Sequence, residues 1–497
     1  MIEIGDKVQR LSAEVVVVGA GSSGAVVAAR LVESGTKVAL LEAGPDYGAF
    51  EAGRWPADLL DAHALATSHD WGYASGPVAG RAAWTFERAR VIGGCSAHNG
   101  AIAAVGHARD YDAWQLPAWR TELLRPLFAL ALDKMRVRTY APGEIGPFHA
   151  RCLAAAAGCG WSMGEDLCEL DANASFGREA VNIVDRLRWN TAFAYLDPVR
   201  SYPNLRIVDQ ALVDRVIESS DGVSITAWRG GQALRLDAER VVLCAGVYGT
   251  PSILQRSGIG DPATLKAAGV KSTHPLRGVG TNLHDHPMVH VDREIGADLQ
   301  RWLDAAKAHG FLPEEQTLGK ALSSRAHDGI YDLHLFPVCA STQTVLTNGR
   351  ALVEVACMTP HSRGRLDITS SDPATAPRID HRYLSDVDDH DLTVLRDGLN
   401  MAEALLAHPA LATVLGKAVT DISNDAAIRR EVAHYYHPVG TCAMGDSGDA
   451  VCRENGQVQG LERIFVGDVS LMPLIPRANT NIPAVMIGER IAQLLAQ

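Results

Sequence analysis

Fully apolar runs near the start of the chain define the first predicted elements. Residues 15–18 (VVVV) are apolar at every position, without alternation of polar and apolar residues. Such a run is typical of a parallel strand that is buried on both faces. We expect a helix over Ser23–Ser34 and then a second strand that ends at Glu42. The pattern predicts strand, tight turn, helix and strand, the opening of an α/β fold with a parallel sheet.

Later segments predict further elements. Residues 203–217 predict two strands, and residues 235–250 predict a strand that enters a glycine-containing turn and a helix and returns to the first sheet. Residues 333–340 and 351–360 predict strands of an antiparallel sheet, and residues 388–411 have the periodicity of a surface helix. Internal repeats, low-complexity linkers and long charge runs are absent from the sequence. We therefore expect domains that share a core rather than domains joined by a flexible tether.

Composition narrows the class of protein. The 497 residues are 47% hydrophobic and 21% charged, ordinary values for a globular protein, and the formal net charge is −12. This acidic balance argues against a nucleic-acid surface and against binding to an anionic membrane. No apolar run is long enough to predict a membrane span, and the start of the chain is charged and lacks the apolar core of a signal peptide. We expect a cytoplasmic protein.

The cysteines predict neither disulfides nor a metal site. The nine cysteines are scattered, their number is odd, and no CxxC pair occurs. This usage favours a reducing compartment over a disulfide framework, and it contains no zinc pattern.

Three glycines follow the first strand with the spacing GxGxxG, at Gly19, Gly21 and Gly24. The first permits a tight turn, the second lets the backbone approach a pyrophosphate, and the third lets helix and strand pack closely. The phosphates would lie at the positive N-terminal end of the helix that starts at Ser23. Glu42 ends the second strand, where an acid can bind ribose hydroxyls. Dinucleotide binding is favoured over a chance glycine turn, and FAD or NAD over NADP.

One histidine lies among small residues in the stretch GGCSAHNGAI, residues 93–102. Small residues let a backbone approach a ligand closely, whereas a bulky imidazole there needs a reason. One interpretation is a helix entry in which Ser96 caps the helix and His98 fills space. The other is that His98 touches, or is bonded to, the ligand that the glycines approach.

Several motifs resemble the glucose–methanol–choline oxidoreductase family. GGCSAHNG with HARDYDAW (93–114) resembles its first signature, and GVYGTPSILQRSGIG (246–260) resembles its second, with Val247 in place of a smaller residue. HPVGTCAMG, VGDVSLMP and ANTNIPAVMIGERIA resemble the C-terminal block of the family. The matches occur in family order, and only about residues 288–350 match poorly. The resemblance implies an FAD enzyme that acts on alcohols.

The resemblance also implies a fold and a cofactor site. The fold would be α/β, with a Rossmann-like FAD-binding domain and a discontinuous α+β substrate domain built on an antiparallel sheet that covers the flavin. The FAD-binding domain would comprise residues 1–150, 200–287 and 440–497, and the substrate-binding domain residues 151–199 and 288–439. The residues expected to bind FAD are Gly19, Gly21, Ser22, Ser23, Gly24, Glu42, Ala43, Arg90, Gly93, Gly94, Cys95, His98, Asn99, Gly100, Val213, Ala245, Gly246, Asp468 and Asn481.

The same resemblance gives His98 a specific role. Choline-oxidising members of the family carry a histidine at this position, bonded to the 8α-methyl group of the flavin. A covalent bond from His98 to FAD is therefore implied; it would prevent dissociation of the cofactor and raise its reduction potential. The alternative is a noncovalent histidine packed beside the flavin ring.

Alcohol oxidation needs an acceptor for the hydroxyl proton and a group that stabilises the developing alkoxide, while flavin N5 can accept the hydride. By resemblance, His437 occupies the position of the catalytic histidine, and Asn479 the partner position, where an amide can donate a hydrogen bond. His361 and Trp55 match substrate-contacting positions. Without the resemblance, His437 would be interpreted as a buried histidine at a turn.

Three other histidines are expected to be structural. We expect His434 to support the site, and His284 and His286 to be buried and hydrogen-bonded. A metal pair at His284 and His286 is the alternative, although no supporting carboxylate or cysteine pattern follows.

The substrate is less well defined than the chemistry. Binding of a trimethylammonium group needs aromatic faces and an acid. Residues 300–330 give no matching acid, and Gly100 replaces a serine found near the flavin in choline-oxidising members. We expect a different primary or benzylic-type alcohol, with a choline-type amino alcohol as the alternative.

The electron acceptor and the reaction class also have alternatives. The acceptor would be oxygen, or a quinone or carrier protein; Tyr435 favours the second because its bulk would restrict oxygen access to the flavin. A flavin-containing cyanohydrin lyase is another possibility within the family. A non-catalytic flavoprotein is disfavoured by the presence of His437, Asn479 and the flavin glycines. The sequence leaves the oligomeric state open.

Overall fold

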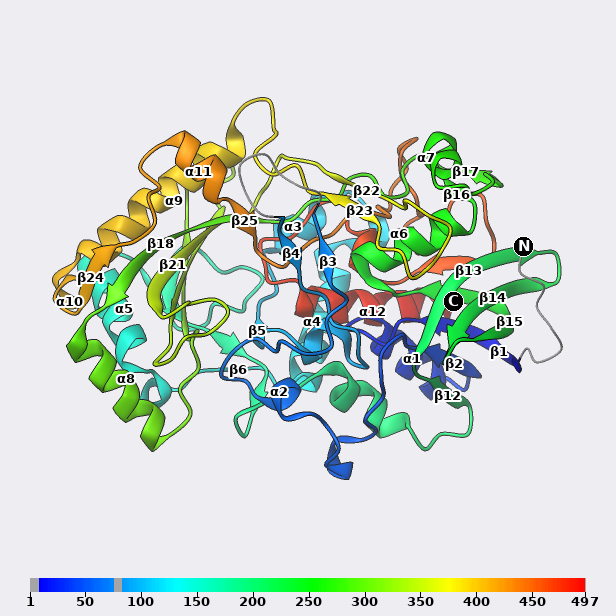
Figure 1. Cartoon of the computed structure of the whole chain (residues 1–497), viewed down its shortest axis with the longest axis horizontal. Helices are drawn as coiled ribbons and strands as arrows, with labels where there is room; N and C mark the ends of the chain where they lie inside the picture. Colours follow the sequence, from blue (N-terminus) through cyan, green and yellow to red (C-terminus); the bar gives the residue numbers. More distant parts are fainter. Residues whose placement is uncertain (1–8, 76–82, 497) are drawn as a thin grey trace.

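Two β-sheets organise the computed structural model, which describes residues 9–75 and 83–496 (Figure 1). The first eight residues of the expected FAD-binding domain lie outside this description. The first sheet has the order β12-β2-β1-β15-β14-β13, and β26 pairs with β15. Its strands are β1 (Gln9–Val18), β2 (Val38–Leu41), β12 (Leu205–Val208), β13 (Ala211–Ser219), β14 (Gly222–Arg229), β15 (Gln232–Leu243) and β26 (Ile464–Val466).

The parallel part of this sheet confirms the first prediction. β1 is parallel to both β2 and β15, and β12 and β26 continue the parallel order on either side. Val15–Val18 are at most 3% exposed because neighbouring strands and packed helices cover them. The predicted helix is α1 (Gly24–Glu33). The predicted return of residues 235–250 to this sheet is also confirmed, since β15 pairs with β1 and leads into α6 (Gly246–Arg256).

The C-terminal helix α12 (Asn481–Leu495) packs against α1 and α4 (Thr121–Lys134). Buried Glu489 on α12 accepts hydrogen bonds from the Arg30 guanidinium of α1, both at 2.8 Å, and from the Tyr195 hydroxyl at 2.9 Å. This paired, hydrogen-bonded carboxylate fixes α12 and the turn that precedes it.

The second sheet has the order β24-β18-β21-β20-β19-β8-β7, with β25 also pairing with β18. All of its pairs are antiparallel except β7 with β8. The prediction of antiparallel strands over 333–340 and 351–360 is therefore confirmed. The strands are β7 (Met163–Gly164), β8 (Ser175–Arg178), β18 (Pro287–Ile295), β19 (Thr317–Ala321), β20 (Leu333–Cys339), β21 (Arg350–Cys357), β24 (Leu415–Ala418) and β25 (Ala433–His434).

The two faces of this sheet differ in chemistry. One face carries Val353, Val355 and Cys357, which share an apolar core with α9 (His390–Ala407). Because side chains alternate along a strand, Glu354 and Ala356 point to the other face, and His334 does so on β20. Helices α5 (Pro147–Gly158) and α8 (Ala297–His309) also pack on the apolar side. The second face therefore carries buried polar groups.

The helix predicted over 388–411 is present as α9 followed by α10 (Pro409–Ala412). The predicted domain boundaries remain a prediction, although the strands of the two sheets fall in the expected segments, except Pro287 at the start of β18. The remaining helices are α2 (Ala57–Leu60), α3 (Ala108–Asp112), α7 (Pro262–Ala267) and α11 (Asp425–Glu431). The remaining strands are β3 (Tyr73–Ala74), β4 (Thr85–Phe86), β5 (Ile102–Ala103), β6 (Arg138–Thr139), β9 (Ala180–Val181), β10 (Ile183–Val184), β11 (Leu187–Arg188), β16 (Ile259–Gly260), β17 (His274–Pro275), β22 (Arg365–Asp367) and β23 (Arg378–Asp380).

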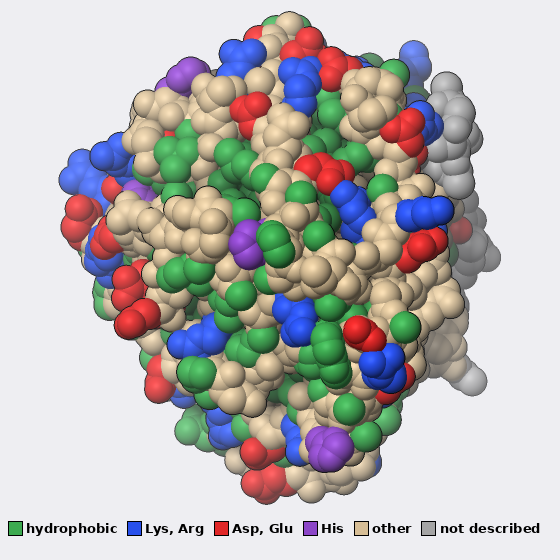
Figure 2. Space-filling view, turned by 90° about the vertical axis from the view of Figure 1, so that its left-hand side faces the viewer, with side chains coloured by type: hydrophobic (Ala, Val, Ile, Leu, Met, Phe, Trp, Pro, Cys, Tyr) green, Lys and Arg blue, Asp and Glu red, His purple; other side chains and the backbone are tan. Residues whose placement is uncertain are grey.

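The surface seen in Figure 2 carries basic and acidic side chains in mixture. All nine cysteines are free thiols. Within residues 9–75 and 83–496, every helix is too short or too polar to cross a bilayer.

Candidate functional site

The glycine-rich turn between β1 and α1 is tightly packed. Gly19 has φ +97°, and a Cβ atom added there would lie 2.4 Å from the Cys244 carbonyl oxygen. A Cβ atom at Gly24 would lie 1.9 Å from the Gly19 carbonyl oxygen. The turn and the close helix packing therefore require glycine at both positions. A Cβ atom at Gly21 would contact only the Gly94 Cα, at 3.7 Å, so space remains beside Gly21.

The segment from Arg90 to Gly94 crosses this turn. Gly93 donates its N–H to the Ala20 carbonyl at 2.8 Å, and the Arg90 side chain donates to the Ala43 carbonyl at 3.3 Å. A Cβ atom at Gly94 would lie 2.5 Å from the Gly21 Cα, so the two backbones are in direct contact. Residues 90–94 therefore lie against the first βα turn. Both segments could then contribute to one dinucleotide site.

Glu42 is buried at the end of β2. Its carboxylate accepts hydrogen bonds from the N–H groups of Ala20, at 2.9 Å, and Gly44, at 2.8 Å. Burial raises the pKa of Glu42, and these backbone donors oppose the rise. Glu42 therefore holds the turn in shape, and its contact with a ribose stays a prediction.

Two further turns meet the first one at the carboxyl ends of the parallel strands. At the β15–α6 turn, Gly246 donates its N–H to Asp468, which follows β26, at 2.8 Å. The Ala245 N–H donates to the Thr250 hydroxyl. Val213, on β13, is buried. At the start of α12, Asn481 accepts from the Ser22 hydroxyl at 2.9 Å, and Ser23 donates to the Ala484 carbonyl at 2.8 Å. Ligands of open α/β sheets bind at this end of the strands.

His98 ends the short helix η2 (Gly94–Ala97). Its ring is 7% exposed, and Nε2 lies 2.8 Å from the Ser68 carbonyl oxygen. Because a carbonyl only accepts, Nε2 carries the proton and Nδ1 is unprotonated. Burial lowers the pKa of His98, which favours this neutral form. The expected capping by Ser96 is wrong: Ser96 lies within η2 and donates its hydroxyl to the Gly93 carbonyl.

The neighbours of His98 are also held in place. Cys95 is half-buried inside η2, and Asn99 accepts the Ala101 N–H through its side chain at 3.1 Å. A Cβ atom at Gly100 would lie 2.6 Å from Glu315 Oε2, so the missing side chain at Gly100 makes room for that carboxyl group.

His437 lies in a buried polar cluster that the sequence did not reveal. Its backbone N–H donates to Asp285 at 3.0 Å, and its Nδ1 lies 3.1 Å from Nδ1 of His286. The Tyr435 ring is 4.8 Å from the His437 ring between centroids. Burial lowers the pKa of His437 well below its ordinary value, and His286 and Arg88 lower it further. His437 is therefore a neutral imidazole.

The roles expected for the flanking histidines are only partly confirmed. His284 is satisfied as predicted: Nδ1 donates to the Asn282 carbonyl at 2.7 Å and Nε2 accepts the Ile475 N–H at 3.0 Å. His286 is buried as predicted and its Nδ1 is hydrogen-bonded to His437, but its Nε2 has no hydrogen-bond partner among the described residues. The HDH sequence at 284–286 drew attention to both histidines, but the pairing of His286 joins residues 151 positions apart.

Asn479 lies between the segment that contacts His284 and the start of α12. Its side-chain Oδ1 is buried without a hydrogen-bond partner, as is Nδ2 of Asn481. Leaving such groups unpaired costs about 1–3 kcal/mol each. These two amides and the space beside Gly21 fit a large polar cofactor.

Within the described residues, neither His361 nor Trp55 has a recorded contact with His437. The His361 side chain is half-exposed; its ring stacks on His390 at 3.7 Å and pairs with Asp388 at 3.6 Å. Trp55 is buried; its Nε1 donates to the Gly48 carbonyl, and its ring packs edge-on to Phe193. The expectation that they contact substrate was based on motif position, and their observed partners are surface and core residues.

Four buried glutamates act electrostatically on one another: Glu179, Glu314, Glu315 and Glu354; all except Glu314 also act on Tyr435. Both Glu179 oxygens lack a hydrogen-bond partner. Burial raises the pKa of Glu354 to about 8 and that of Glu314 to about 7, and raises those of the other two well above the ordinary value. Within the described residues, none of the four forms an ion pair. Glu314 and Glu315 fall in the segment where no acid was predicted.

His334 shares this buried region. Its ring is fully buried, neither ring nitrogen has a hydrogen-bond partner, and Tyr435 lies 6.3 Å away between centroids. The Tyr435 hydroxyl is also unpartnered. Sequence analysis missed His334 because a single histidine in an apolar strand gives no signal of its own.

Comparison with known protein families and structures gives a consistent result. Two GMC oxidoreductase family models match residues 13–288 and 360–488. Proteins named "Oxygen-dependent choline dehydrogenase" from Chromohalobacter salexigens and Paraburkholderia phytofirmans are 30% and 31% identical; each alignment covers 96% of this chain and 93% of the relative.

Solved structures are similar over nearly the whole chain. Pyridoxine 4-oxidase from Mesorbium loti has a TM-score of 0.85 at 25% identity, covering 97% of this chain and 98% of that one. A formate oxidase variant from Aspergillus oryzae has a TM-score of 0.83 at 20% identity, covering 98% and 99%, and shows the fold alone.

The space beside Gly21 gives a direct test of the cofactor site. Gly21→Val adds a side chain that meets no protein atom closely at Cβ, so the fold should form, but the pyrophosphate would be blocked. We expect the variant to purify with little FAD, measured by the ratio of flavin to protein absorbance, and with an unchanged circular dichroism spectrum. Gly143→Val, at an open surface position, should keep its FAD. Full flavin occupancy in Gly21→Val would contradict the site.

Proposed function

The chain belongs to the GMC oxidoreductase family, and from this premise we propose that it oxidises an alcohol to an aldehyde or ketone with FAD, using His437 as the proton acceptor. The main support is the buried, neutral His437, held by Asp285 and His286. A neutral imidazole can take the hydroxyl proton of an alcohol. When bound, FAD supplies the acceptor for the hydride.

The contact between the two histidines supports a proposal for which His437 nitrogen acts as the base. Two Nδ1 atoms 3.1 Å apart form a hydrogen bond only if one of them carries a proton. We infer that His437 donates from Nδ1 to His286, which leaves the Nε2 lone pair of His437 free as the base. His286 then keeps His437 in the reactive tautomer, as a carboxylate does in other catalytic triads.

The Asn479 amide is proposed to donate a hydrogen bond to the substrate oxygen as negative charge develops on it. A preorganised donor in a site without water stabilises such charge strongly. Its unpartnered side-chain oxygen leaves the amide free of competing protein contacts on that side.

His98 is proposed to hold FAD covalently. With Nε2 donating to Ser68, the unprotonated Nδ1 is the nitrogen available for a bond to the cofactor. This choice of nitrogen follows from the hydrogen bond, and a bond through Nε2 would require the Ser68 contact to break.

The remaining proposals follow from the sequence. The electron acceptor is oxygen, or a quinone or carrier protein, and the bulky Tyr435 beside His437 supports the latter. The protein is proposed to act in the cytoplasm.

A second candidate substrate class is an amino alcohol. Four buried glutamates have no ion-pair partner among the described residues, and burial raises their pKa values, which keeps them largely protonated; a bound cation would stabilise their carboxylate forms. Glu179, Glu315 and Glu354 act electrostatically on Tyr435, whose ring lies 4.8 Å from the His437 ring between centroids, and this supports a cation subsite beside the proposed base. The relatives named choline dehydrogenase support this candidate as well.

Replacing His437 tests the base. His437→Ala should lower the rate of anaerobic flavin reduction by about 10²–10⁴, and Asn479→Ala by about 10²–10³, in stopped-flow measurements with saturating alcohol. Because the pKa of His437 lies well below 6.5, kcat/KM should be flat above that pH and fall as the pH drops through the depressed pKa. His274→Ala, a partly buried histidine on β17, is the control.

A variant His437→Ala that reduces its flavin at the wild-type rate would contradict the assignment. Flavin that stays oxidised with every alcohol tested, in a protein that cleaves a cyanohydrin, would instead indicate a lyase.

The proposed covalent bond has a test that is independent of activity. Acid precipitation of the wild type should leave the flavin in the protein pellet, and His98→Ala should release it to the supernatant. His107→Ala should behave as wild type. Peptide mass spectrometry would then assign the modified residue. Wild-type flavin that appears wholly in the supernatant would refute the covalent bond, but not alcohol oxidation.

The glutamate group can be tested with choline and its uncharged isostere 3,3-dimethylbutan-1-ol. If the glutamates bind a cation, kcat/KM should favour choline by at least about tenfold, or about 1.4 kcal/mol. Glu315→Gln should reduce this preference without affecting the isostere, and exposed Glu294→Gln should not. Equal or better use of the isostere by the wild type would refute the amino-alcohol candidate and leave alcohol oxidation standing.

A further inference from the structure

A cluster of three possible metal ligands lies outside the proposed active site. Cys357 is the last residue of β21, and His390 and Asp391 are the first two residues of α9. A thiol sulfur, an imidazole nitrogen and a carboxylate oxygen from these residues all lie within 4.8 Å of one another. All three side chains are buried, at 0%, 6% and 0% exposure.

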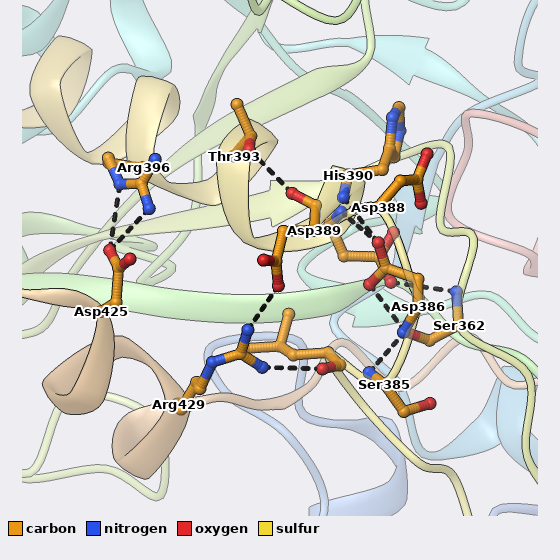
Figure 3. Close-up of polar contacts among 12 residues, drawn as sticks. Ser362, Ser385, Asp386, Asp388, Asp389, His390, Thr393, Arg396, Asp425 and Arg429 are labelled. Carbon is orange, nitrogen blue, oxygen red and sulfur yellow. Dashed lines mark hydrogen bonds and ion pairs between the residues drawn. The ribbon is translucent and has the colours of Figure 1, made fainter.

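The surrounding loop holds these side chains in position. Asp391 accepts the backbone N–H groups of His361 at 2.7 Å and Ser362 at 3.1 Å. Asp386 accepts the N–H of His390, which fixes the start of α9 (Figure 3). Cys357 is fixed by its place in the sheet, opposite Leu333 of β20. The end of β21, the start of α9 and the backbone around Ser362 therefore hold the three side chains in position.

The charge around the cluster is unbalanced. The carboxylates of Asp332, Asp386 and Asp391 all act electrostatically on His390. None of these three carboxylates forms an ion pair with lysine, arginine or histidine in the described part of the chain. Arg363, the basic residue that acts on Asp391, donates its Nη1 hydrogen bonds to the carbonyls of Pro360 and Ser362 instead. Asp332 and Asp391 are buried, and a buried carboxylate is costly unless it is hydrogen-bonded, paired or bound to a metal ion.

We propose that Cys357, His390 and Asp391 bind one zinc ion. Thiolate and imidazole ligands favour zinc and exclude calcium and magnesium, which prefer oxygen. Tetrahedral zinc ligands lie about 3.5 Å apart, so movements of about 1 Å would close the site. On binding, the Cys357 thiol loses its proton to solvent as the zinc–sulfur bond forms, and no redox change occurs.

The ion would join two elements that the sequence keeps apart. It would connect the end of β21 to the start of α9 and close the 358–389 loop. The next residue, Met358, packs in the same apolar group as Tyr435, so the zinc site would also support the wall of the proposed substrate site. A surface hollow of about 570 Å³ lies over this segment and is lined in part by His361 and Asp386.

Zinc content and coordination test the proposal on the holoenzyme. Protein purified without chelator, then given zinc and desalted, should hold about one zinc per chain by elemental analysis. X-ray absorption should show one sulfur at about 2.3 Å and nitrogen or oxygen at about 2.0–2.1 Å. Cys357→Ser should remove the sulfur signal and weaken zinc binding by at least about tenfold, and Asp391→Asn should weaken it by about the same factor.

Cys339→Ser is the matched control, because Cys339 is equally buried at the end of the adjacent strand and in the same core. It should retain zinc with the wild-type sulfur signal. Zinc binding below one-tenth of an equivalent in the wild type would overturn the proposal and leave the three residues as core and turn contacts. Zinc that binds equally in Cys357→Ser, or without a sulfur ligand, would also overturn it. Flavin reduction is not used as the readout, so these outcomes are independent of the proposed alcohol oxidation.

Discussion

Direct backbone contact at the first βα turn is the constraint on which the candidate site depends. The 90–94 segment lies so close to the turn and to the end of β2 that side chains are excluded at Gly94 and Gly44, where an added Cβ atom would lie 2.5 Å and 1.9 Å from another backbone. This contact continues directly into η2, and η2 ends at His98. The position of His98 beside the glycine turn therefore follows from sterics, and of the three glycines in this turn only Gly21 has open space beside it.

The second sheet supplies buried polar side chains to the candidate site. Its apolar face is covered by helices, and its other face presents His334 and Glu354 to the buried interior near Tyr435 and His437. Such groups cost folding free energy unless a partner satisfies them. Their retention between the two sheets is consistent with a polar ligand there.

Prediction from the sequence succeeded where a pattern was local. Each successful prediction rests on a pattern within about thirty residues: the VVVV run, the glycine spacing, and the strands at 333–340 and 351–360. Backbone geometry gives each of these patterns a preferred local structure. Prediction failed where contacts join distant segments. His286 faces His437 across 151 residues, and Glu315 occupies the space left by Gly100. Substrate contact by His361 stays a prediction; its half-exposed side chain stacks on His390 and lies 3.6 Å from Asp388.

The sequence alone determined the start of the parallel sheet and the glycine turn, because periodicity and glycine spacing reflect steric rules that act over a few residues, and motif resemblance indicated the family. Only the tertiary structure decided which polar groups are buried together: the His286–His437 pair, the glutamate group, and the Cys357, His390 and Asp391 cluster. Burial and charge balance depend on which distant segments pack against one another. No local pattern in the chain encodes that packing, so the chemistry of these clusters became visible only in three dimensions.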